Sequence, residues 1–489
     1  MFIISLNISM VGPPNIPIKD TILSFEFSKF FNLLSTSESI YRTPDTPLRF
    51  FFFLLSIIFF IQMILAKKMI NQLPKYLDKP VSILCYLFLL TILISDDLYN
   101  YIAIILIVLS LVYILLFSEN DLTKDEFILL SGYVFVFMIP FWSSLFHSTS
   151  LAEIDNYLRF LFAVPVFLTL RHIKFSLNDL YTSINLASFF IGIFALYSLI
   201  FLGETRVRGF TSTAVIFGNI SLLFSLFSLL SLKYYSDKGK SILLPLLASS
   251  FAFFAWASTG SRGSILLILI MIILLFTKDF RKSVLIPGKA LLAITVTVFI
   301  IFINSSTFSR YINAYESTYN YFTDGSGFYW AHVDSIVPRI NIWKGVIILI
   351  NDNFYTGIGL DNFNSSLASV ISQKKSPPIR PASDNLNAGM NHAHNQYLDI
   401  FAKTGVFGFL SLIYFIISHF YYFYRQSRAS VNIDGYQILP MIGILSTYGY
   451  MTYMISHSIL SHQQSTLFMT LLLIILSGII GSKIRSVKL

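Results

Sequence analysis

Long, continuous apolar runs constrain this chain of 489 residues more than any other feature. A helix that crosses a bilayer needs about 20 mostly apolar residues. The runs are not alternating, which favours helices over a β-barrel, because every backbone group must be hydrogen-bonded inside the bilayer. We therefore predict an all-α polytopic membrane protein with about 12–13 transmembrane helices. The thirteen candidate spans lie near residues 49–66, 80–95, 99–117, 127–146, 157–170, 180–202, 212–232, 241–258, 263–277, 290–304, 397–424, 437–456 and 463–481.

The basic residues predict how the chain is oriented, because short cytoplasmic loops of membrane proteins are enriched in Lys and Arg. On one side of the predicted helices the short loops hold nineteen basic residues, whereas the opposite side holds only Arg206, Arg208 and Arg262. This asymmetry places the C-terminus in the cytoplasm and explains the net charge of +9 without a nucleic-acid partner. The nineteen are Lys67, Lys68, Lys75, Lys79, Lys124, Arg171, Lys174, Lys233, Lys238, Lys240, Lys278, Arg281, Lys282, Lys289, Arg425, Arg428, Lys483, Arg485 and Lys488.

The spans and the charge pattern divide the chain into four predicted regions. Residues 1–48 form an N-terminal segment with an amphipathic patch that could lie on the membrane surface. Residues 49–304 contain the first ten spans, and residues 397–489 contain the last three. An odd number of spans leaves the N-terminus outside, and one missed or extra span would return it to the cytoplasm. Residues 305–396 are then one large loop on the outer side of the membrane.

The large loop is too long for a plain connector and too aromatic for a disordered segment. Residues 340–351 are expected to form a short amphipathic helix, and a loop with Gly357, Gly359, Pro377 and Pro378 is expected to follow. Its aromatic residues could stack on sugar rings or form a belt at the membrane interface, and the sequence leaves both open. They are Tyr311, Tyr315, Tyr319, Tyr321, Phe322, Phe328, Tyr329 and Trp330.

Several kinds of chemistry find no support in the sequence. The single cysteine, Cys85, lies in an apolar run, which excludes a disulfide framework and a cysteine-based metal site. Acidic residues on the predicted outer side are too scattered for a confident divalent-cation site. Walker, dinucleotide-binding and Gly-x-Ser-x-Gly motifs are absent. We expect no metal and no soluble cofactor.

The three arginines on the outer side are candidates for binding a phosphate. Burying a charge at that level of the membrane costs about 2.5–3.5 kcal/mol on insertion scales, so each is a functional candidate. Arg339, near the start of the predicted loop helix, adds a fourth cation. The planar guanidinium gives a phosphate two parallel charge-assisted hydrogen bonds. The structural alternative is a side chain that extends toward lipid headgroups.

The segment from Asn391 to Leu398 holds the candidate base, at the end of the polar loop and before an apolar span. His394 can accept a proton from a sugar hydroxyl near neutral pH. His392 lies two residues before it, and Asn395 carries an amide able to orient a hydroxyl. The alternatives are a loop histidine bonded to its neighbours and a His-x-His metal site, which lacks further ligands nearby.

These features together resemble the bacterial O-antigen ligase and polymerase superfamily. Residues 259–263, Thr-Gly-Ser-Arg-Gly, look like its small-residue arginine motif. Arg339 with Ile342-Trp343, then Gly357-Ile358-Gly359 and Asn362-Phe363, looks like the start of its periplasmic loop. His394-Asn395, then nine residues, then Gly405-Val406-Phe407-Gly408, is similar to the histidine signature that ends that loop. The resemblance covers about residues 204–410.

The resemblance implies a glycosyltransferase of the inner membrane that moves a glycan from undecaprenyl diphosphate, without metal, to an acceptor hydroxyl on the periplasmic side. The acceptor is the lipid A core in a ligase and a second lipid-linked glycan in a polymerase. By this resemblance His394 is the general base, and Arg262 and Arg339 bind the donor diphosphate with help from Arg206 or Arg208. A transporter of lipid-linked sugars is the alternative of another class, although its charges would be expected nearer mid-membrane.

Overall fold

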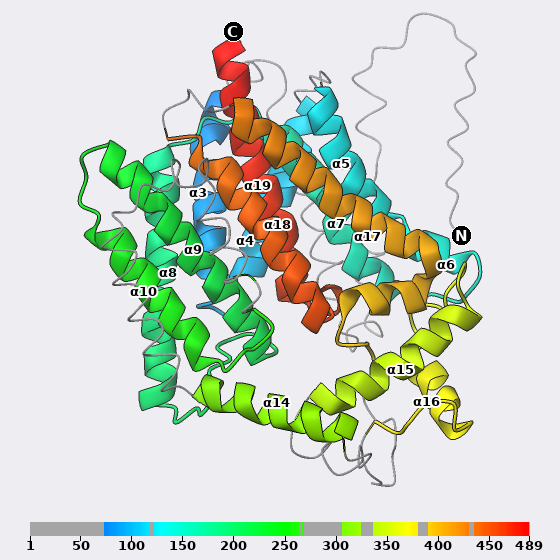
Figure 1. Ribbon diagram of the computed structural model, residues 1–489. Helices are drawn as coiled ribbons and strands as arrows, with labels where there is room; N and C mark the ends of the chain where they lie inside the picture. The colour runs from blue at the N-terminus through cyan, green and yellow to red at the C-terminus, as the bar shows by residue number, and fades with distance from the viewer. Residues whose placement is uncertain are drawn as a thin grey trace, which may run out of the picture. The chain divides into compact units, whose positions relative to one another are not determined.

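The computed structural model describes residues 73–116, 122–264, 267, 306–323, 336–379, 390–429 and 435–488, and within these ranges every regular element is a helix. This confirms the all-α class. The helices are α3 (Leu73–Thr91), α4 (Leu98–Leu116), α5 (Lys124–Phe137), α6 (Ile139–Ser144), α7 (Leu151–Leu170), α8 (Leu177–Ile200), α9 (Ala214–Asp237), α10 (Leu243–Ser258), α14 (Ser306–Thr323), α15 (Ile336–Asp352), α16 (Phe363–Ser372), α17 (Gln396–Ala429), α18 (Ile438–Ser456), the 3₁₀ turn η3 (Ile459–Ser461) and α19 (Gln463–Lys488) (Figure 1).

Seven segments within the described ranges are long and apolar enough to cross a membrane: α4, α5 continued by α6, α8, α9, α17, α18 and α19. The spans predicted near 80–95, 157–170 and 241–258 are also helical, as α3, α7 and α10. They are not among the seven, because α3 and α7 each carry three charged residues toward one end and α10 has only 16 residues. The spans predicted near 49–66, 263–277 and 290–304 lie outside the described residues, apart from residues 263, 264 and 267.

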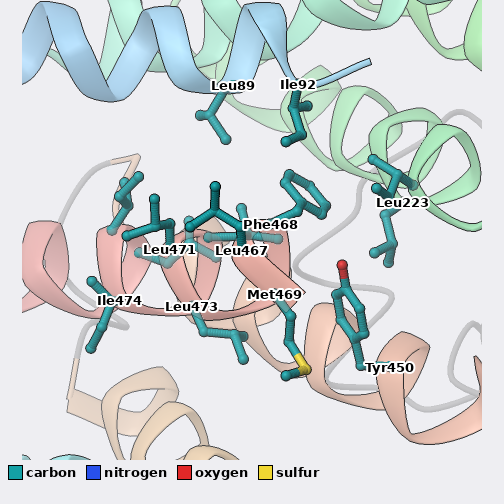
Figure 2. Packing of buried hydrophobic residues seen from close by; sticks show 14 of the residues in the cluster. Leu89, Ile92, Leu223, Tyr450, Leu467, Phe468, Met469, Leu471, Leu473 and Ile474 are labelled. Carbon is teal, nitrogen blue, oxygen red and sulfur yellow. The ribbon is translucent and has the colours of Figure 1, made fainter. Parts of the chain in front are cut away.

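Helices α9 and α19 are the most deeply buried of the seven candidate spans. Figure 2 shows how the apolar side chains of α19 meet Leu89 of α3, Ile92 just after that helix, Leu223 of α9 and Tyr450 of α18. A helix that is apolar on every side belongs in the interior of a helical bundle. These two helices therefore form the core around which the others pack.

Serine side chains let α9 pack closely against its neighbours. Ser225 hydrogen-bonds Ser249 of α10, with 3.2 Å between their hydroxyl oxygens, and Ser228 donates to Ser188 of α8 over 2.8 Å. Small hydroxylated residues are typical of helix contacts in membranes, because they allow a close approach and satisfy each other's polar atoms. The serine-rich sequence of α9 thus fits its position between α8 and α10.

The span predicted at 397–424 is a broken helix. At Gly405 the backbone adopts φ 67° and ψ −163°, a region that essentially only glycine occupies, and it divides α17 into two parts. The chain between α15 and α16 docks on the break. Val406 N–H donates to the carbonyl of Phe354, and Ile358 N–H donates to that of Ala402, each over 2.9 Å. The predicted span is confirmed within α17, and the break at Gly405 is a feature that the sequence analysis did not predict.

Helices α14, α15 and α16, all from the predicted large loop, lie at the end of the bundle away from the C-terminus (Figure 1). The helix expected at 340–351 is confirmed as part of α15. The helices α14 and α16 were not predicted. The apolar side of α16, with Phe363 and Leu367, packs against Ile342 and Val346 of α15. The serines of α16 obscured this amphipathic pattern in the sequence.

Candidate active site

Three of the four predicted phosphate-binding arginines line one pocket. Arg206 comes from the connection between α8 and α9, Arg262 follows α10, and Arg339 lies in the first turn of α15. The pocket has a volume of about 130 Å³ and is also lined by Val215, Gly260, Ser261, Gly263 and Ser456. The tertiary structure thus brings together arginines that are up to 133 positions apart in the chain.

Small residues after α10 shape the wall of this pocket. The Thr259 hydroxyl donates to the carbonyl of Trp256 over 2.7 Å and accepts from the Ser261 N–H over 3.1 Å. Arg206 Nε donates to the Thr259 carbonyl over 2.6 Å, which ties the two arginine-bearing segments together. Gly260 has a φ of 61°, which a larger residue adopts only with strain. The motif at 259–263 is therefore a tight turn that presents Arg262.

Arg208 is placed differently from the other three arginines. It is absent from the described pocket lining, and its backbone N–H donates to the carboxylate of Glu204 over 3.4 Å. The sequence could not choose between Arg206 and Arg208, and the geometry favours Arg206 as the third pocket cation.

Beside this pocket the structure assembles a cluster of four histidines: His392, His394, His457 and His462. The ring centroids of His392 and His394 are 4.3 Å apart, and those of His457 and His462 are 4.5 Å apart in a stacked arrangement. The centroid of His394 lies 6.2 Å from that of His457. Sequence reasoning missed the second pair. A signal was present, because the loop between the last two predicted spans opens on the same side as the large loop.

Burial and neighbouring positive charge keep this cluster uncharged. Burial, followed by His392, Arg339 and His462, lowers the pKa of His394 to about 3. Burial and His392 lower the pKa of His462 to about 4. The pKa values of His392 and His457 are also lowered, first by burial. His394 is therefore a neutral imidazole at pH 7, able to accept a proton. Arg339 acts on it electrostatically while also lining the pocket.

The backbone that carries His394 is fixed on both sides of Ala393. The Asp399 carboxylate accepts the Ala393 N–H over 2.8 Å, and Trp343 Nε1 donates to the Ala393 carbonyl over 2.9 Å. Asp399 is itself paired with Lys403 at 3.1 Å. His394 adopts a φ of 52°, which is uncommon for a residue other than glycine. These contacts hold it in that conformation.

Asn395 has a structural role in addition to the predicted role of orienting a substrate hydroxyl. Its side-chain oxygen accepts the N–H of Leu398 over 3.1 Å, which caps the N-terminus of α17. The amide oxygen is therefore occupied in holding the helix that follows His394. Its role toward a substrate hydroxyl stays a prediction.

The four histidines are not arranged as a metal site. Among the described residues, no group of three or more His, Cys, Asp or Glu could hold a metal ion. The candidate site consists of a cationic pocket and an uncharged imidazole cluster, with Arg339 acting on both.

A comparison with known families gives this geometry a context. Residues 247–413 match the family model described as O-antigen ligase. This match supports the O-antigen ligase superfamily for that part of the chain. The matched range contains Arg262, Arg339 and His394, whereas Arg206 and the pair His457 and His462 lie outside it. An uncharacterized protein of Haemophilus influenzae is 27% identical over 401 residues, which cover 81% of this chain and 96% of that protein.

The match to the O-antigen ligase model supports an activity of the ligase or polymerase type, in a multi-pass bacterial membrane protein that handles a lipid-linked glycan. Within the matched range, Gly357 and Gly405 take part in the docking of the α15–α16 connection on α17. A Cβ on Gly357 would meet the backbone of Lys403, and one on Gly405 would meet that of Tyr355. Gly357 and Gly405, one from each motif, are thus explained by one contact.

Proposed function

We propose that this protein is an O-antigen ligase-type glycosyltransferase that moves a glycan from undecaprenyl diphosphate to a hydroxyl of the lipid A core. The reaction takes place at the periplasmic face of the bacterial inner membrane. The observation that carries the proposal is the position of Arg339, which lines the arginine pocket and acts electrostatically on the neutral His394. A cation for the donor and a base for the acceptor therefore belong to one site.

The proposed reaction is a direct displacement at the anomeric carbon of the glycan. His394 removes the proton of the acceptor hydroxyl as its oxygen attacks. A new bond forms between the anomeric carbon and that oxygen, while the bond to the donor phosphate oxygen breaks. Undecaprenyl diphosphate leaves with the electron pair, and Arg206, Arg262 and Arg339 stabilise its negative charge. His394 then releases its proton to solvent.

His394 is suited to this step although its pKa in the free protein is about 3. A bound diphosphate brings negative charge close to the histidine cluster. That charge favours the imidazolium and raises the pKa of His394 toward the range of an effective base. Donor binding thus prepares the base for the acceptor.

A repeat-unit polymerase is the alternative within the family, with a second lipid-linked glycan as acceptor. The glycan that accumulates after deletion of the gene distinguishes a ligase from a polymerase. Loss of a ligase leaves long chains on the lipid carrier, whereas loss of a polymerase leaves a single repeat on the core. A transporter of lipid-linked sugars is the alternative of another class, and the family match favours the transferase over it.

The decisive experiment replaces His394 with Ala in the full-length protein reconstituted in lipid. Transfer of glycan from the lipid-linked donor to lipid A core should be lost, while donor binding is retained. His172→Ala is the control, because His172 lies at the end of α7, beside Tyr113 and away from the cluster. Normal transfer by the His394→Ala protein would rule out the proposed mechanism.

A further inference from the structure

Polar atoms that are buried without a hydrogen-bond partner concentrate around the histidine cluster. His457 is 4% exposed, and both of its ring nitrogens lack a partner among the described residues. The Nδ1 atoms of His392 and His394, Nε2 of His462 and the hydroxyl of Ser458 share this property. A buried polar group without a partner costs about 1–3 kcal/mol. Such a concentration in one place points to a polar ligand.

The end of α18 contributes neighbouring residues to the two parts of the site. Ser456, the last residue of α18, lines the arginine pocket. His457 follows it with an extended backbone, φ −155° and ψ 145°, and meets the rings of His394 and His462. The cationic pocket and the histidine cluster are therefore adjacent at this point of the chain.

The cluster is open to solvent at its rim. His392 and His462 are half-buried, and His462 Nδ1 hydrogen-bonds the hydroxyl of the exposed Ser212 over 3.0 Å. His457 lies deepest, beneath His462. A ligand that enters over Ser212 and His462 would reach His394 without passing through the arginine pocket.

The chemistry of the cluster selects the class of ligand. A neutral imidazole has one N–H donor and one nitrogen acceptor, and a sugar hydroxyl likewise donates and accepts. The arginine pocket, not the cluster, carries the charge that attracts an anion. Several neighbouring imidazoles can therefore hold several hydroxyls of one polyhydroxylated ring.

We infer that His457 and His462 form a subsite that binds hydroxyl groups of the acceptor sugar and aligns one of them with His394. This inference rests on the proposed function and adds the place of the acceptor to it. The donor and the acceptor then meet at the end of α18, where Ser456 lines the arginine pocket and His457 belongs to the histidine cluster.

The test uses the full-length protein in lipid nanodiscs, with undecaprenyl-diphosphate-linked glycan as donor and purified lipid A core as acceptor. His457→Phe and His462→Phe keep the stacked rings but remove the nitrogens. We expect the acceptor KM to rise about tenfold, the effect of losing one or two hydrogen bonds, while the donor KM stays within twofold. Gln at either position, which has both a donor and an acceptor, should recover part of the loss.

A variant at the rim keeps the test informative if a phenylalanine variant fails to fold. Ser212→Ala removes only the hydroxyl that holds His462, and it should raise the acceptor KM by a smaller factor of about two to five, consistent with a net loss of 0.5–1 kcal/mol. An unchanged acceptor KM in Ser212→Ala and in the folded phenylalanine variants would overturn the subsite. If instead His394→Ala transfers normally, it is the proposed function that fails.

Discussion

At the scale of single residues, the conformation of His394 is the most informative feature. Its φ of 52° is maintained because the peptide groups of Ala393 are held by Asp399 and Trp343. A strained backbone at a site of this kind is stable only where the surroundings over-determine it. The position of the base therefore depends on residues that do not touch the substrate.

Trp343→Phe tests this positioning role. The change keeps the aromatic ring and removes only the Nε1 donor, so the Ala393 carbonyl loses its partner at a cost of about 0.5–1.5 kcal/mol. We expect kcat to fall several-fold with an unchanged donor KM, measured in the nanodisc assay. A purely structural tryptophan would give a lower unfolding temperature with an unchanged kcat.

Arg262→Ala and Arg208→Ala are a test variant and its matched control for the donor site. Arg262→Ala removes a pocket cation and should weaken donor binding about tenfold or more, because a charged hydrogen bond contributes about 1.5–3 kcal/mol. Arg208→Ala should leave the donor Kd nearly unchanged. The measurement is calorimetric titration with undecaprenyl diphosphate, and equal losses in both variants would contradict the assignment.

The pH dependence of the reaction should respond to Arg339. His394 works as the neutral base, so activity is present above its pKa and is lost as the pH falls through it. Burial, then the positive charges of His392 and Arg339, lower this pKa to about 3 in the free protein. Arg339→Gln removes one of these charges, and the acidic limb of kcat/KM for the donor should move to higher pH. If the acidic limb of the pH profile does not move, Arg339 does not act on the pKa of the base.

At the scale of elements, the break in α17 is the point at which the helix that carries Arg339 is held against the segment that carries His394. The connection between α15 and α16 docks on Gly405, so α15, which carries Arg339, and the first part of α17, which follows His394, are held together. Their relative position depends on a backbone conformation that essentially only glycine adopts.

Gly405→Ala should disrupt this docking. The new methyl group would collide with the Tyr355 backbone, in addition to a backbone strain of about 1–3 kcal/mol in this glycine-only region. The control is Gly203→Ala, since Gly203 has a similar φ of 64° but no atom within 4 Å of the added Cβ. Thermal unfolding in detergent should show a clearly larger loss for Gly405→Ala, together with reduced transfer. Equal losses would mean that the docking contributes little.

At the scale of the whole molecule, the bundle separates its two ends. Helices α14 to α16 lie at one end, and the C-terminus lies at the other (Figure 1). The arginine pocket includes Arg339 of α15. From the positive-inside rule we predict that the first end faces the periplasm and the second the cytoplasm. The side on which the proposed reaction occurs depends on this orientation.

Two variants, each with one added cysteine, test the orientation. Ser372 at the end of α16 and Ser236 at the end of α9 are both exposed, and the native Cys85 is buried. In intact spheroplasts a membrane-impermeant maleimide should label Ser372→Cys, whereas Ser236→Cys should react only after lysis. The reverse labelling pattern would mean that the topology is inverted, and it would contradict a site on the periplasmic side.

The sequence by itself determined the helical class, the helix in α15 and the family, because apolar length, charge asymmetry and motif spacing are local properties of a chain. It also singled out the arginines that line the pocket and His394, although not their contacts. Their roles in the reaction stay predictions. It failed at Gly405, where an apolar run conceals a break that only docking with a distant segment explains.

Only the tertiary structure decided which arginine joins the pocket and which histidines surround His394. Arg206 and Arg208 are two positions apart and chemically identical, so their different surroundings arise from how the α8–α9 connection packs on Thr259. His457 and His462 reach the cluster because the end of α18 and the start of α19 lie beside the start of α17. Such contacts between distant segments depend on packing of the whole bundle, which no local pattern encodes.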